Sequence, residues 1–170
     1  MPKPIRLYVR YVDATSDAVG VVTMYLIYLM IGVLLLDAVT RNIINVPQYW
    51  CIEVAQFTLA AYYIVGGAYS LRLGAHVRMD VLYEKFSERG KARIDAFTDL
   101  CMLFYLVCLL IGSVSSTLYA WRYGQTLFSM WSPSLVPIKI IMVCGIVLMI
   151  LQVLSILFKD IARARGITLS

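Results

Sequence analysis

The sequence predicts an all-α integral membrane protein with four transmembrane helices. Four segments of 18 to 22 residues contain no charged side chain: Val19–Leu36, Val54–Leu71, Leu100–Trp121 and Ile140–Phe158. At about 1.5 Å per helical residue they span roughly 27 to 33 Å, close to the hydrocarbon core of a bilayer. The composition agrees, because 61% of the chain is hydrophobic, 15% is charged and the mean hydropathy is +0.80, whereas soluble domains average about 25% charged residues.

The four spans and their connections use nearly all of the 170 residues. We therefore expect a single membrane domain over residues 1–170, with spans at about 19–39, 51–72, 97–121 and 138–158. The first apolar run is longer than the apolar region of a typical signal peptide, and no small-x-small cleavage site follows it. It is expected to remain as the first span.

Basic residues alternate between the two sides of these spans. Twelve of the 15 lysines and arginines lie before span one, between spans two and three, or after span four, and only Arg41, Arg122 and Lys139 lie in the other two connections. This asymmetry predicts that both termini are cytoplasmic. It also explains the net charge of +5 without a nucleic-acid partner, because the charges follow the membrane topology.

The predicted outer side carries the aromatic residues. Trp50, Trp121 and Trp131 are the only tryptophans, and all three fall at the outer ends of spans. This placement is typical of an interfacial aromatic belt, with docking of an external partner as the alternative. In the same region Asp37 and Arg41 are four residues apart, so a local ion pair is expected.

Span two carries small residues at intervals of seven. Ala60, Gly67 and Gly74 lie along one stripe, where two helix backbones can approach closely. The spacing predicts a helix interface but leaves open whether the neighbouring helix belongs to this chain or to another.

The connection between spans two and three predicts a short amphipathic helix at about 78–87. Met79, Leu82, Tyr83 and Phe86 recur at i, i+3, i+4 and i+7, with charged residues between them. Such a helix would lie on the cytoplasmic membrane surface, where basic residues meet anionic lipid head groups.

The spans lack the residues that chemistry inside a membrane requires. The uncharged runs contain no ionisable Asp, Glu, Lys, Arg or His and no proline that would break a helix, and the only histidine, His76, lies in a connection. No catalytic, cofactor-binding or metal site is predicted, so we expect no enzyme activity. An independent four-helix exporter of the small multidrug type is the alternative function, but it needs a membrane-embedded carboxylate, and Glu53 lies near the outer end of span two.

Three short motifs stand in a fixed order on this topology. They are R-x5-P-x2-W-x2-E over residues 41–53, G-A-H-V-R-M-D over residues 74–80, and W-S-P-S-L-V-P-I-K over residues 131–139. With the span number and loop lengths, they make roughly residues 10 to 160 resemble the small membrane subunit (DctQ-like, Q component) of tripartite ATP-independent periplasmic (TRAP) transporters.

The resemblance implies a partner-dependent function. In this family a large elevator-type membrane subunit holds the substrate and sodium sites, and a periplasmic substrate-binding protein delivers an organic acid. The chain would brace the scaffold of the large subunit in the cytoplasmic (inner) membrane of a bacterium or archaeon. It would need no cofactor of its own, since sodium is expected in the large subunit, and its partners would be these two proteins and membrane lipids.

The matching residues are expected to be structural or to face a partner or lipid. Those of the cytoplasmic motif are expected to stabilise the turn after span two: Gly74, His76, Arg78 and Asp80. Those of the outer motif are expected to pair within the chain, with the large subunit or with a lipid: Arg41, Trp50 and Glu53. Before span four, Pro133 and Pro137 are expected to set the entry to the span and Lys139 to snorkel to the interface, while Trp131 is expected at the outer aromatic edge.

Overall fold

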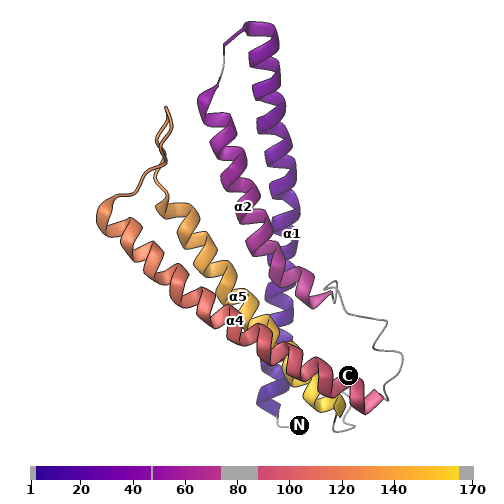
Figure 1. Ribbon diagram of the computed structural model, residues 1–170. Helices are drawn as coiled ribbons and strands as arrows, with labels where there is room; N and C mark the ends of the chain where they lie inside the picture. Colours follow the sequence, from indigo (N-terminus) through magenta and orange to yellow (C-terminus); the bar gives the residue numbers. More distant parts are fainter. Residues whose placement is uncertain (1–2, 47, 74–87, 165–170) are drawn as a thin grey trace.

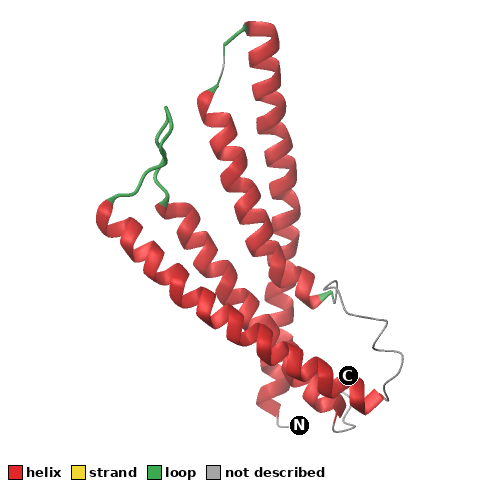
Figure 2. Ribbon diagram, in the orientation of Figure 1, coloured by secondary structure: helices red, strands yellow, loops and turns green. Residues whose placement is uncertain are grey.

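Four long helices make up most of the computed structural model, which describes residues 3–46, 48–73 and 88–164. They are α1 (Lys3–Val39), α2 (Tyr49–Arg72), α4 (Glu88–Tyr123) and α5 (Val136–Ala164). Each contains a segment long and apolar enough to cross a membrane, and none of the described residues forms a strand (Figure 2). The all-α fold with four membrane-capable helices is therefore confirmed. The predicted surface helix at 78–87 lies outside the described residues.

The helices form two antiparallel hairpins, α1 with α2 and α4 with α5 (Figure 1). Helix α5 packs against α2 and also contacts α1, which joins the two hairpins. The hairpins meet at the end where α1 begins and α5 ends, here called the termini end, and diverge toward the opposite end, here called the loop end. The charge asymmetry of the sequence predicts that the termini end is cytoplasmic.

At the loop end, α1 and α4 each end at a residue with a positive φ. Helix α1 widens into one π-helical turn, η1 (Thr40–Ile44), which is capped by Asn45 in the left-handed conformation (φ 57°). Helix α4 ends at Gly124, which has φ +57°, and the amide of Gln125 donates to the carbonyl of Ala120 at 3.1 Å. Asparagine and glycine suit these positions because they tolerate a positive φ, so local sequence decides where both helices stop.

The apolar core lies where α2, α4 and α5 meet. Leu71, Leu106 and Val153 are buried there, with methionine, leucine and isoleucine side chains packed around them. Two glycines allow close approach of the helices: an added Cβ at Gly145 would lie 2.5 Å from the Ile64 side chain, and one at Gly20 would lie equally close to the Tyr69 ring.

The small-residue stripe of α2 proves to be an interface within the chain. Ala61 and Ala68, which follow Ala60 and Gly67 directly in the sequence, are buried, and a Cβ at Gly67 would lie 3.1 Å from the side chain of Met149 on α5. The question that spacing left open is settled for this part of the stripe. Gly74 lies outside the described residues.

Helices α2 and α5 are central, and α1 and α4 are peripheral. In the membrane-capable windows of α2 and α5, 28% of the residues are buried, against 11% in those of α1 and α4. Large apolar side chains are therefore exposed along both outer helices. Such surfaces require lipid or another membrane protein to cover them.

Candidate functional site

A network of polar side chains joins α1 to α5 near the termini end. We call it the polar clasp: Asp13, Ser16, Gln152, Ser155 and Lys159. The carboxylate of Asp13 accepts hydrogen bonds from Lys159 Nζ at 2.7 Å, Gln152 Nε2 at 3.1 Å and Ser155 Oγ at 3.4 Å. The hydroxyl of Ser16 donates to Gln152 Oε1 at 2.7 Å. Because Ser16, Gln152 and Ser155 are fully buried, water does not reach their polar atoms, and these hydrogen bonds satisfy them instead.

The helical repeat explains why the clasp forms. On α5, Gln152, Ser155 and Lys159 are spaced i, i+3 and i+7, so they share one face. Asp17, four residues after Asp13 on α1, forms an ion pair with Arg72 of α2 and so connects α1 to its hairpin partner. Charge and hydrogen bonds thus tie three helices together at the end where the hairpins converge.

Lys139 makes a corresponding contact within the α4–α5 hairpin at the loop end. Its ammonium group donates to the carbonyl and hydroxyl of Ser116, at 3.2 and 2.9 Å, and to Gln125 Oε1 at 2.9 Å. The sequence predicted that Lys139 would snorkel to the membrane interface. These three acceptors belong to the α4–α5 hairpin, and the placement of Lys139 at the membrane interface stays a prediction.

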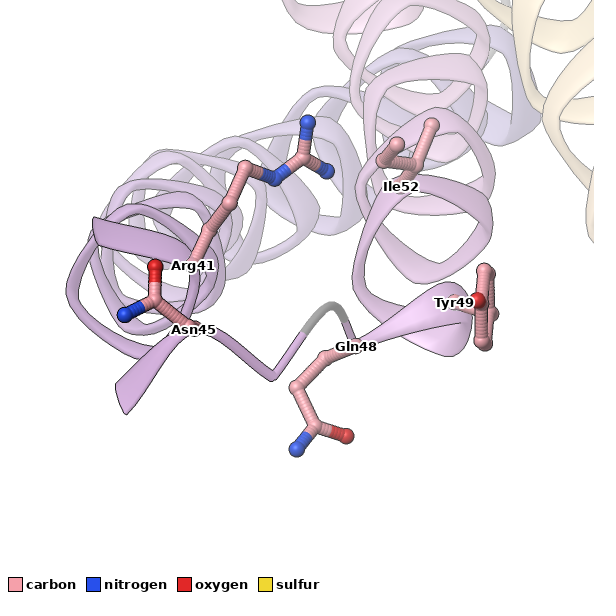
Figure 3. A pocket seen from close by; sticks show the side chains of 5 residues that line it. All are labelled: Arg41, Asn45, Gln48, Tyr49 and Ile52. Carbon is pink, nitrogen blue, oxygen red and sulfur yellow. The ribbon is translucent and has the colours of Figure 1, made fainter. Parts of the chain in front are cut away.

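Arg41 pairs with Asp37, as the four-residue spacing predicted, at 3.2 Å. It does not bind Glu53. Beside it, a shallow hollow of about 430 Å³ opens between the end of α1 and the start of α2. Figure 3 shows Arg41 and Asn45 on one side of this hollow and Tyr49 and Ile52 on the other.

Glu53 is the least exposed charged residue of the predicted outer motif. It lies one turn into α2 and is only 6% exposed. Within the described part of the chain its Oε2 atom is buried and has no hydrogen-bond partner, and the same holds for Oδ1 of Asp37. A buried carboxylate oxygen in this condition is costly unless a proton or an outside donor satisfies it.

The two aromatic residues of the outer motifs come together. Trp50 and Trp131 line one hollow of about 210 Å³, with Gln48, Tyr49 and Met130, so the connection between α4 and α5 reaches the start of α2. That connection is ordered by its own bonds, including Leu127 N to Pro133 O at 3.0 Å. Pro137 is the second residue of α5, which fits its expected place in the first turn, whereas Pro133 lies in the connection.

The residues of the predicted cytoplasmic motif are not part of the described structure. Gly74, His76, Arg78 and Asp80 all lie outside the described residues. Across the described ranges, no three His, Cys, Asp or Glu side chains gather as a metal ion would require.

Sequence reasoning missed the polar clasp. The signal was present in the i, i+3, i+7 spacing of polar residues at the end of the last apolar run. The sequence did not reveal that Asp13 is the partner of this polar face, because Asp13 is 139 residues from Gln152 and no local pattern relates the two.

These features define a class: an integral membrane protein of four helices, held together by polar contacts at the ends of its spans. Residues 30–163 match the family described as tripartite ATP-independent periplasmic transporters, DctQ component. Since the match covers most of the chain, the chain belongs to this family and is the small membrane component of a TRAP transporter. No curated protein and no solved structure matched it significantly.

Proposed function

We propose that this chain braces the large membrane subunit of a sodium-coupled TRAP transporter for organic acids. The large subunit binds cargo and sodium and moves as an elevator, while this chain stays fixed in the bilayer beside its scaffold. Both termini are cytoplasmic, and the loop end faces the periplasm, where the aromatic side chains around Trp50 and Trp131 are available to the substrate-binding protein.

The observation that carries this proposal is that basic side chains at the ends of the spans bind groups of the same chain. Four of those at the ends of the described spans are engaged in ion pairs or hydrogen bonds: Arg41, Arg72, Lys139 and Lys159. An organic acid is anionic and would need unoccupied cationic donors in its path. Here these donors hold helices together or stabilise a helix end, which favours a structural role and leaves cargo binding to another subunit.

The alternative of an independent multidrug exporter has less support. Its coupling carboxylate would have to lie deep in the membrane, whereas Glu53 lies one turn from the start of α2. Family membership also places the chain in a tripartite system.

Purification with the partner proteins tests the proposal. The tagged chain is expressed with the large membrane subunit and binding protein encoded beside it, purified, and placed in liposomes with a sodium gradient and a labelled organic acid. We expect the large subunit to co-purify and uptake to require sodium and all three proteins. Uptake by liposomes that contain this chain alone would overturn the proposal in favour of the exporter.

A further inference from the structure

The connection between α4 and α5, here called the finger (residues 124–135), projects from the loop end. Figure 1 shows it extending beyond the ends of both helices. Two backbone hydrogen bonds of 3.0 Å join its arms, from Leu127 N to Pro133 O and from Leu135 N to Gln125 O. These bonds keep the two arms together, so the finger presents its tip in a defined position.

The tip of the finger carries large apolar side chains that are almost free of contacts. Phe128 is 106% exposed and Met130 is 82% exposed. These are the two highest values among the exposed large hydrophobic residues of the described chain. Apolar side chains gathered on an ordered protrusion are typical of a surface that a partner covers.

The tip projects past the lipid head groups. The uncharged run of α4 ends at Trp121 and covers about 33 Å, close to the thickness of the hydrocarbon core. The finger then runs extended through Thr126, which forms an antiparallel bridge with Ser134. At roughly 3.3 Å per extended residue, three residues carry Phe128 roughly 10 Å beyond the end of α4. The head-group layer on one side of a bilayer is only about 5 to 8 Å thick, so water rather than lipid surrounds the tip.

The α4–α5 hairpin also carries positive charge that no acidic group balances at this end. Between residues 100 and 158, Arg122 and Lys139 are the only charged residues. Arg122 is exposed, and no acidic side chain within the described ranges forms an ion pair with it. Lys139 is hydrogen-bonded, but its acceptors are neutral groups of Ser116 and Gln125, so its charge persists. The spans of the α1–α2 hairpin and their connection have the opposite balance, with two acidic residues and one basic residue.

We propose that the finger is a docking site for the substrate-binding protein, an inference that rests on the proposed function. Phe128 and Met130 enter an apolar depression on that protein, and carboxylates around the depression face the charge of Arg122 and Lys139. Two observations select this occupant. The tip lies in the water outside the membrane, where a soluble protein reaches it, and the positive charge attracts an acidic surface. A loop that is already ordered also loses little conformational entropy when it binds.

Photocrosslinking in the assembled complex tests this site. The photoreactive residue p-benzoylphenylalanine replaces Phe128 in the chain, which is purified with the large subunit and placed in lipid nanodiscs. The substrate-binding protein encoded beside the chain is then added. Ile43, which is 74% exposed at the loop end of the other hairpin, is the matched control position. After irradiation we expect adducts with the binding protein from position 128 and none from position 43.

Substitutions measure the apolar and charged contributions separately. Phe128→Ala should weaken binding of the substrate-binding protein about tenfold, because an aromatic side chain that fills a pocket is a typical hot spot. Arg122→Gln should weaken binding about threefold and make it less sensitive to salt, whereas Arg122→Lys should preserve both properties. Ile43→Ala is the control and should leave binding unchanged. The measurement is the Kd for the complex in nanodiscs at two ionic strengths.

The outcomes separate this inference from the proposed function. If the large subunit co-purifies but position 128 forms adducts only with lipid or with the large subunit, the docking site is wrong and the bracing function stands. Equal yields of adducts from positions 128 and 43, or unchanged binding of both Phe128→Ala and Arg122→Gln, would also overturn the docking site. If the large subunit does not co-purify with the unmodified chain, the proposed function itself fails.

Discussion

Removal of the Asp13 carboxylate should loosen the junction between the two hairpins. The variant Asp13→Ala deletes the acceptor for Lys159 and Gln152. A hydrogen bond to a charged group contributes about 1.5 to 3 kcal/mol and a neutral one about 0.5 to 1.5 kcal/mol. The Lys159 side chain keeps 35% of its surface exposed and can turn toward head groups, so its share is discounted. We expect a loss of about 2 to 3 kcal/mol in the free energy of unfolding, because the buried Gln152 amide also loses a partner.

Unfolding in mixed micelles with increasing dodecyl sulfate, followed by far-ultraviolet circular dichroism, measures this loss. The variant Lys159→Met and the double variant complete a cycle, and the expected coupling energy is about 1 kcal/mol. Thr15→Ala is the matched control on α1, since its hydroxyl bonds only to the Tyr11 carbonyl of its own helix, and it should change stability by less than about 0.5 kcal/mol.

Additivity of the two single variants would refute the reasoning. It would mean that Asp13 and Lys159 do not stabilise one another, whatever each contributes alone. A loss for Asp13→Ala no larger than that of the Thr15→Ala control would refute it as well, since the clasp would then contribute nothing to the junction.

Three further changes test other contacts. Gly145→Ala should lower the free energy of unfolding by about 1 to 3 kcal/mol, because its Cβ would lie 2.5 Å from Ile64 Cγ2 and 3.3 Å from the Ile64 backbone. The control Gly112→Ala, with open space around the new carbon, should be neutral or stabilising by up to about 1 kcal/mol. Equal effects of the two variants in the same unfolding assay would contradict the close packing at Gly145. Lys139→Met should cost about 1 to 2 kcal/mol and speed amide hydrogen exchange in the connection after α4, and unchanged exchange would argue against its bridging role. Glu53→Gln should reduce the share of large subunit retained during purification without changing which organic acid is preferred, and an altered preference in transport assays would count against a purely structural role.

Local features of the sequence predicted the helices well. Charge-free runs reveal membrane spans because each residue in hydrocarbon contributes its own transfer free energy, whatever its neighbours in space. The Asp37–Arg41 pair was predictable for a similar reason, since both residues lie on one helix four positions apart.

Contacts between helices were harder to predict. Spacing identified the small residues around Gly67 as an interface, but the identity of the neighbour depended on how α5 crosses α2, and it proved to be Met149 of the same chain. The acceptors of Lys139 could not be predicted, because they are 14 and 23 residues away in the sequence. A lysine near the end of a span looks the same whether it points to solvent or to a neighbouring helix.

By itself, the sequence determined the four spans, their family and the side on which their positive charges gather, since hydropathy and charge act residue by residue. Only the tertiary structure decided that α2 and α5 are central, that Asp13 meets Gln152 and Lys159, and that the hairpins converge at one end. Those facts depend on helix crossing and rotation, which arise when side chains far apart in the chain pack against one another.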